Sequence, residues 1–164
     1  MSSSSNPQWT HDVFLNFRGE DTRSNFVSHL DAALTNAGIA TYIDRQLHKG
    51  TELGPELSRA IEGSHISIVI FSKRYTESSW CLNELKTIME CHRTHAQIVV
   101  PVFYDVDPSV VRQQKGAFGE VLRDTAKRIY FESGDERMEY VLSTWRSALT
   151  QAANFSGWDL TNCR

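Results

Sequence analysis

Short apolar segments that suit β-strands alternate along this chain with segments whose apolar residues recur at helical spacing. The expected strands are residues 11–17, 39–43, 66–71 and 98–104, and the expected helices begin near residues 22, 55, 79, 108, 118 and 141. Residues 66–71 are almost continuously apolar, which is typical of a strand buried on both faces. The alternation therefore predicts an α/β fold, a doubly wound parallel sheet with helices on both faces and right-handed crossovers.

Four details of this arrangement carry separate predictions. Pro101 has no amide to donate, so the fourth strand is expected to have a bulge or an edge position there. A fifth strand is weakly signalled, and we place it within residues 154–160 or in the preceding loop. The charged residues 132–139 predict a loop, and Ser156 with Gly157 predicts the end of the last helix.

Length and composition indicate one globular domain. The chain has 164 residues, of which 40% are hydrophobic and 23% charged, and its net charge of −3 gives no bulk attraction to nucleic acid or an anionic membrane. We expect residues 1–10 to form a serine-rich tail, residues 11–160 the domain, and residues 161–164 the start of a linker or a truncated end. No segment reaches transmembrane length, and the first ten residues lack the apolar core of a signal peptide.

The cysteines indicate free thiols. The chain has three cysteines, Cys81, Cys91 and Cys163. Because their number is odd and two of them fall inside one expected helix, we predict a reducing compartment without a disulfide framework. Cys91 and His92 with His95 resemble metal ligands, but no set of four ligands is completed around them. We therefore expect no metal site.

The residues that suggest chemistry lie at 78–85, where the third expected strand leads into a helix. Ser78 or Ser79 can cap that helix, and Trp80 and Glu84 are four residues apart on one helix face. An indole ring can stack on a base or a nicotinamide, and a carboxylate near a helix start, where its ionised form is favoured, can stabilise positive charge on a sugar carbon. An isolated pair of this kind is more often a buried tryptophan with a solvated glutamate. In parallel sheets, however, ligands bind beyond the carboxyl ends of the strands, which is where this stretch lies.

Several reaction classes are disfavoured by missing motifs. The chain lacks G-x-G-x-x-G, a P-loop and a nucleophile elbow, and the positions of a receiver domain's acids hold Phe17-Arg18-Gly19 and Ser72-Lys73. Cleavage of a nicotinamide N-glycoside remains, because the leaving group departs neutral and one carboxylate suffices. Arg18 and the Gly19 backbone would reach phosphate or nicotinamide groups, and Lys49-Gly50 would close over the ligand. The alternative to a ligand site also stays open: the charged residues would form a solvated, salt-bridged helix start, and the glycines would serve only in turns. The catalytic interpretation requires the Glu84 carboxylate to face a cavity, since a buried carboxylate would leave only an assembly role.

Six stretches of the chain stand out in order, residues 12–23, 38–44, 62–72, 79–85, 101–112 and 152–158. They resemble the boxes of plant TIR domains, and the match extends over roughly residues 11–160. The resemblance implies the TIR fold, a flavodoxin-like sheet of five parallel strands flanked by helices. It also implies a place at the N-terminus of an intracellular immune receptor, before a nucleotide-binding oligomerisation module (NB-ARC) and leucine-rich repeats. The expected location is the cytoplasm, with the nucleus as a second compartment.

The resemblance further implies an oligomerisation-dependent NAD(+) nucleosidase in plant defence and cell-death signalling. NAD(+) or NADP(+) is then the substrate rather than a cofactor, and the products are nicotinamide and ADP-ribose-type signalling nucleotides. Glu84 matches the family's catalytic glutamate. The positions that match its nucleotide site are Arg18, Gly19, Glu20, Asp21, Thr22, Arg23, Gly50 and Trp80. Asp44-Arg45-Gln46 stands where many relatives carry two acids, which changes the details of loop closure.

Self-association is the other expectation that the resemblance carries. Ser28 and His29 match a pair in one contact surface, and Gly157 matches a glycine in a second surface, although a role as helix C-cap explains Gly157 equally well. Both surfaces are polar or built on small residues, so the isolated domain is expected to associate weakly with other TIR domains. The alternative function is a non-catalytic module that signals through these homotypic contacts.

Overall fold

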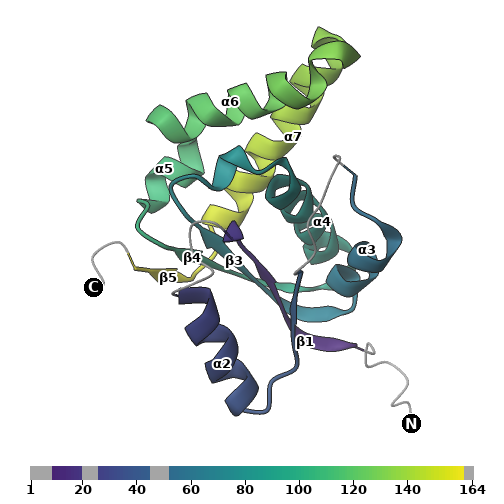
Figure 1. Cartoon of the computed structure of the whole chain (residues 1–164), viewed down its shortest axis with the longest axis vertical. Coiled ribbons are helices and arrows are strands. Elements are labelled where there is room, and N and C mark those ends of the chain that lie inside the picture. Colours follow the sequence, from purple (N-terminus) through teal and green to yellow (C-terminus); the bar gives the residue numbers. More distant parts are fainter. Residues whose placement is uncertain (1–8, 20–25, 45–51, 161–164) are drawn as a thin grey trace.

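A computed structural model describes residues 9–19, 26–44 and 52–160, and in them five parallel strands form one sheet with the order β2-β1-β3-β4-β5 (Figure 1). The strands are β1 (His11–Asn16), β2 (Thr41–Ile43), β3 (Ser64–Phe71), β4 (Ile98–Phe103) and β5 (Trp158–Asp159). Every neighbouring pair is parallel, from β1 with β2 to β4 with β5. The predicted parallel sheet is therefore confirmed, and the carboxyl ends of its strands share one edge.

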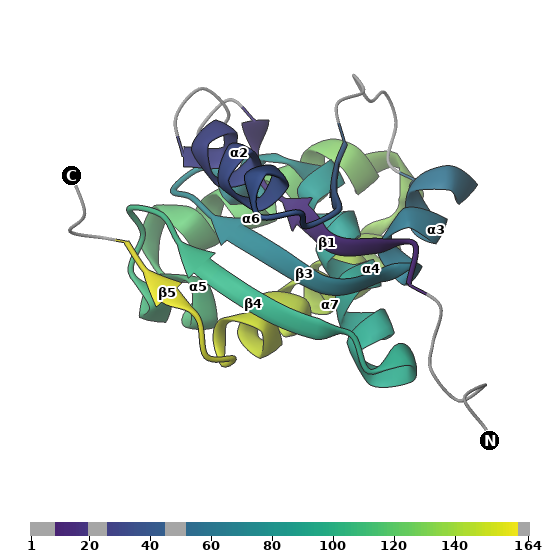
Figure 2. The ribbon, with the colours of Figure 1, turned by 90° about the horizontal axis from the view of Figure 1, so that it is seen from below.

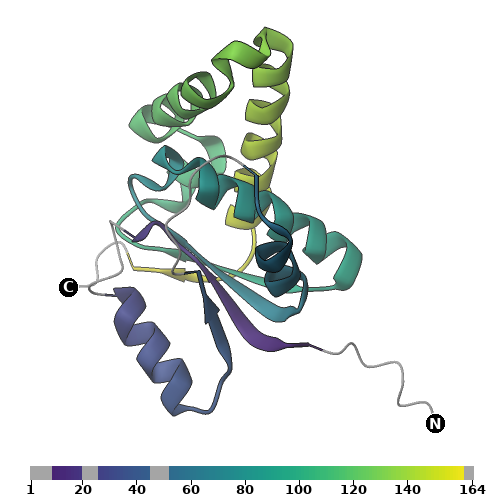
Figure 3. The same cartoon turned by 45° about the vertical axis from the view of Figure 1, so that its right-hand side comes forward.

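Helices cover both faces of the sheet, as predicted. They are α2 (Ser28–Asn36), α3 (Pro55–Glu62), α4 (Ser79–His95), α5 (Pro108–Gln113), α6 (Gly116–Tyr130) and α7 (Asp135–Ala153), with short 3-10 turns η3 (Tyr75–Glu77) and η4 (Phe131–Ser133). Figure 2 shows α2 on one face, and α3 to α7 lie on the other. In Figure 3 the pair α6 and α7 stands away from the sheet on the side opposite α2. The large core therefore lies on the α4 and α7 face, around side chains such as Phe14, Phe71 and Trp145.

The fifth strand and Pro101 lie together at one side of the sheet. β5 falls within residues 154–160, as predicted, and its two residues pair with Val102 and Phe103 of β4. The register of β4 on β3 runs without interruption from Ile98 to Phe103, so there is no bulge at Pro101 against β3. Pairing with β5 begins one residue after Pro101, so the proline occupies a position that is still an edge on that side.

Two boundary predictions and one burial prediction are wrong. Residues 135–139 are helical rather than a loop, because α7 begins at Asp135 and its first turn carries Asp135 and Glu136, whose charges favour a helix start. α7 ends at Ala153 with Asn154 as its C-cap, so Gly157 lies beyond the helix end and does not cap it. On α2, the expected apolar positions Ala33 and Ala37 are exposed. The predicted start of that helix near Asp21 or Thr22 lies outside the described residues.

Candidate active site

The start of α4 is fixed against the end of β1. The hydroxyl of Ser78 accepts a hydrogen bond from the Cys81 amide at 3.0 Å, which confirms Ser78 as the N-cap. The Cys81 thiol in turn contacts the Phe17 carbonyl at 3.1 Å. The apolar stripe of α4, including Leu85 and Ile88, is buried as predicted. These contacts place the beginning of α4 at the carboxyl edge of the sheet, so the candidate residues lie where the architecture favours ligands.

Glu84 is buried at this edge, with 3% of its surface exposed. Its Oε1 accepts a hydrogen bond from the Asn16 side-chain amide at 2.8 Å, and its Oε2 accepts one from the Trp80 indole N–H at 3.1 Å. The same indole N–H lies 3.1 Å from an Asp44 carboxylate oxygen. The expectation that the carboxylate faces a ligand cavity is therefore wrong for this arrangement, since Trp80, Asp44 and Asn16 surround it.

Asn16 orients the carboxyl group of Glu84, and Tyr75 in turn orients Asn16. Both side chains are completely buried. The Tyr75 hydroxyl donates to Asn16 Oδ1 and also lies 3.2 Å from the Cys81 carbonyl. Because Oδ1 is engaged by a donor, the amide Nδ2 must face Glu84. Sequence reasoning missed Asn16 and Tyr75, although one polar residue between Leu15 and Phe17 in an apolar strand was an available signal for Asn16.

The pKa of Glu84 is raised from 4.5 to about 8, chiefly by burial and also by the neighbouring Asp44 carboxylate, while the hydrogen bonds from Asn16 and Trp80 act in the opposite direction. The prediction that the helix start favours the ionised form is wrong here. Glu84 is the sixth residue of α4, which places it in the second turn, and the helix dipole fades beyond the first turn. Loss of water therefore dominates, and the carboxyl is mostly protonated at neutral pH.

Trp80 covers Glu84 with the polar edge of its ring. The side chain is half-buried and packs against the main core, while its N–H is directed at the two carboxyl groups. In this arrangement the indole connects Glu84 to Asp44 at the end of β2. Stacking of the ring on a bound base stays a prediction.

The remaining nucleotide-site residues are only partly described. Arg18 and Gly19 follow β1 at the carboxyl edge and are half-buried. One terminal nitrogen of Arg18 lies 3.8 Å from a Glu77 carboxylate oxygen, and the Arg18 side chain is 12% exposed. Glu20, Asp21, Thr22, Arg23 and Gly50 lie outside the described residues, so their predicted roles stay predictions.

The predicted self-association residues are exposed in the structure. Ser28 and His29 lie on the outer side of α2, and Gly157 lies between α7 and β5. A Cβ atom added at Gly157 would meet the Pro101 carbonyl oxygen at 1.9 Å. Glycine is therefore required at this position by close backbone approach, whatever contacts the surface makes.

The other sequence predictions about chemistry have simpler outcomes. Cys81 and Cys91 are free thiols, as predicted, and both are buried, while Cys163 lies outside the described residues. Within residues 9–19, 26–44 and 52–160, no three His, Cys, Asp or Glu side chains are grouped so as to hold a metal ion. None of the helices in these ranges is long and apolar enough to cross a membrane.

Comparison with known proteins decides the family. The model of the TIR domain family matches residues 10–164. The chain belongs to the TIR domain family. Its relatives include the disease resistance protein RPV1 of Vitis rotundifolia, which is 48% identical over 99% of this chain, and the TMV resistance protein N of Nicotiana glutinosa, which is 46% identical over 95% of it. The chain spans only 11% and 13% of the lengths of these two relatives.

A solved structure extends the comparison to three dimensions. The TIR domains of the activated Roq1 resistosome, which directly recognises the pathogen effector XopQ, match with a TM-score of 0.81 and 45% identity. The match covers 94% of this chain and 90% of that one. The predicted TIR fold is therefore confirmed, and the chain is a TIR domain similar to those of plant disease resistance proteins.

Proposed function

We propose that this TIR domain self-associates and, once assembled, cleaves NAD(+) in plant immune signalling. The observation that supports catalysis is the placement of Glu84 at the carboxyl edge of the sheet, with its two oxygens held by Asn16 and Trp80. The similarity to TIR domains of an activated resistosome supports assembly as the active state. NADP(+) is the alternative substrate, and the nucleotide-binding and leucine-rich modules of a longer cytoplasmic receptor are the proposed partners.

Catalysis requires a change at Trp80 and Asp44. In the arrangement described here the carboxyl group is buried and its pKa is about 8, so it is neither accessible nor fully ionised at neutral pH. By the criterion set from the sequence, this closed arrangement on its own supports only an assembly role, and the proposed catalysis belongs to a second, open arrangement. Movement of the Trp80 indole and the end of β2 away from Glu84 would admit water and lower its pKa. The positive charge of a nicotinamide ring bound nearby would favour the ionised carboxylate further. Assembly that moves these two side chains would therefore switch on the site.

The proposed reaction is a hydrolysis at the ribose carbon. The bond from that carbon to the nicotinamide nitrogen breaks, and nicotinamide departs with the bonding electron pair as a neutral molecule. The ionised Glu84 stabilises the positive charge that develops on the sugar. A water oxygen then bonds to the same carbon and loses a proton to solvent, which leaves ADP-ribose.

Release of nicotinamide from NAD(+) by concentrated protein tests this proposal. We expect Glu84→Gln to lose at least about a hundredfold in rate, the usual cost of removing one electrostatic contact to a transition state. Glu90→Gln is the matched control, because Glu90 is an exposed glutamate on the same helix and takes no part in the site. Equal release by wild type and Glu84→Gln would contradict the proposed role.

Burial of Glu84 favours a second candidate, a non-catalytic module that signals through homotypic contacts. The discriminating variants are Glu84→Gln and the pair Ser28→Ala/His29→Ala, compared for cell death in leaf tissue and for light scattering over a concentration series. A catalytic domain requires Glu84, whereas a pure assembly module signals without it and fails only when the exposed α2 residues change. Substitution of Gly157 is unsuitable for this comparison, because any side chain would clash with Pro101 and disturb the fold.

A further inference from the structure

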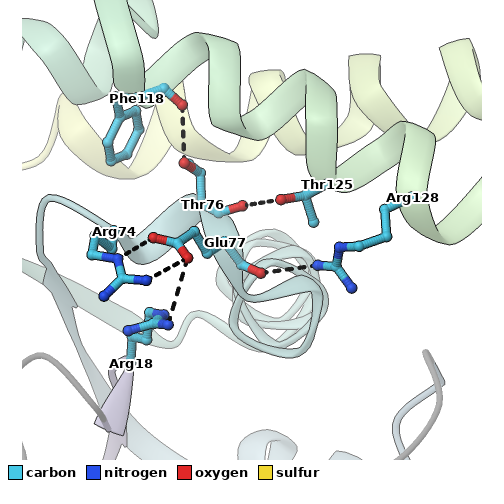
Figure 4. Close-up of polar contacts among 7 residues, drawn as sticks. All are labelled: Arg18, Arg74, Thr76, Glu77, Phe118, Thr125 and Arg128. Atoms are coloured by element: carbon cyan, nitrogen blue, oxygen red, sulfur yellow. Dashed lines mark hydrogen bonds and ion pairs between the residues drawn. The ribbon is translucent and has the colours of Figure 1, made fainter.

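A cluster of arginines surrounds Glu77 at the same edge of the sheet (Figure 4). Arg74 holds the Glu77 carboxylate with two hydrogen bonds, one from its terminal nitrogen at 2.8 Å and one from Nε. A terminal nitrogen of Arg18 lies 3.8 Å from the same carboxylate, and Arg128 donates to the Glu77 backbone carbonyl at 3.2 Å. Three guanidinium groups therefore meet around one acid.

The backbone of this acid is fixed to α6 independently of its side chain. The Thr76 hydroxyl donates to the Phe118 carbonyl at 2.9 Å, and the Thr125 hydroxyl donates to the Thr76 carbonyl at 2.6 Å. Thr76 and Thr125 are buried, and Figure 4 shows both contacts between η3 and α6. Removing the charge of Glu77 should consequently leave the turn in place.

The two contacts of the Glu77 carboxylate differ in strength. Arg74 binds it in the bidentate geometry that guanidinium and carboxylate groups prefer. Arg18 approaches a single oxygen at 3.8 Å, which is a longer and weaker contact. A phosphate group carries more charge than a carboxylate and matches the guanidinium fork equally well. Arg18 can therefore exchange Glu77 for a phosphate while Arg74 keeps the acid.

We propose that Glu77 is a built-in anionic competitor at Arg18, which limits how tightly the phosphate groups of a ligand bind at this edge. Arg18 is two residues from Asn16, which contacts Glu84, so the anion site and the candidate active site share the end of β1. The assignment of the phosphates to a dinucleotide rests on the proposed function. The competition itself concerns any phosphate or pyrophosphate group.

Inorganic pyrophosphate is the probe that separates these two claims. We expect Glu77→Gln to bind pyrophosphate about three to ten times more tightly than wild type, as removal of one partly screened negative charge predicts. The double variant Arg18→Gln/Glu77→Gln should lose this gain. Calorimetric titration at constant ionic strength measures each affinity, and the NMR signal of the Arg18 side chain reports the site directly.

Asp105→Asn is the matched control. Asp105 forms an exposed ion pair with Lys73 at 3.3 Å on the same edge, so its substitution makes the same change in net charge. Equal affinities of wild type and Glu77→Gln, or an equal gain in Asp105→Asn, would overturn the inference. If the pyrophosphate gain is found but no variant cleaves NAD(+), the competition stands and the proposed function fails.

Discussion

Glu77 and Glu84 are seven residues apart and occupy opposite electrostatic environments. Glu77 lies in η3 among arginines, and hydrogen bonding to Arg74, helped by the charges of Arg18 and Arg128, lowers its pKa. Glu84 lies beneath Trp80, where burial raises its pKa to about 8. One acid is therefore ionised and held at the surface, while the other is stored as a mostly neutral group inside the fold.

The comparison shows that exposure and neighbouring charge, rather than residue type or position near a helix start, decide the state of each acid. Glu77 would act on a bound ligand through its permanent negative charge, which repels the ligand's phosphate groups. Glu84 would act only after it gains water or a positive partner. The same edge of the sheet thus holds Glu77, which stays ionised, and Glu84, which ionises only when its surroundings change.

The largest effect should come from Glu84→Gln above pH 8. The pKa of Glu84 is about 8 in the folded domain and 4.5 when unconstrained, so folding is favoured by its bound proton. That stability is complete below about pH 4.5 and is lost as pH rises through 8. Because glutamine stays neutral, the variant should gain on the order of 3 kcal/mol over wild type at pH 9, but little at pH 5. Urea unfolding at both values measures the difference, with Glu90→Gln as control, and a constant offset across pH would argue against a buried proton.

Asn16→Ala should have a smaller effect that is nearly independent of pH below 7. The substitution removes the donor to Glu84 and leaves the Tyr75 hydroxyl without its Asn16 acceptor, inside a completely buried cluster. We expect a loss of about 1–3 kcal/mol of unfolding free energy. Asn36→Ala, at the exposed end of α2, is the control. An Asn16 variant as stable as the wild type would mean that the cluster contributes nothing.

The smallest of the three effects at these two acids should follow Arg74→Gln, which acts on Glu77. Loss of the bidentate pair raises the pKa of Glu77 toward its usual value and should cost at most about 1 kcal/mol at pH 7. Because a lowered pKa stabilises the fold only above it, this deficit should disappear as pH falls through the Glu77 titration. Lys73→Gln, which breaks another exposed pair, should change stability by even less. A loss in Arg74→Gln that exceeds the loss in Asn16→Ala would reverse the ranking of the two regions.

Local patterns predicted the framework well and the burial of the site poorly. The alternation of segments indicated the parallel sheet, and the cap of α4 is Ser78, one of the two serines predicted for it. The groups around Glu84 include Asn16 of β1 and, through the Trp80 indole, Asp44 at the end of β2, which are far from Glu84 in the sequence and meet it only in the fold. The requirement for glycine at position 157 likewise comes from a tertiary contact, the close approach of the Pro101 backbone. Such contacts depend on tertiary packing, which periodicity and spacing do not specify.

The most direct test of this account is an NMR titration of the Glu84 side-chain carboxyl carbon in the dilute domain, assigned with Glu84→Gln. We predict a midpoint near pH 8, because the group is buried beneath Trp80 and Asp44. A midpoint near 4.5 would show a solvated carboxylate and would contradict the claim that the site is stored in a closed, neutral form.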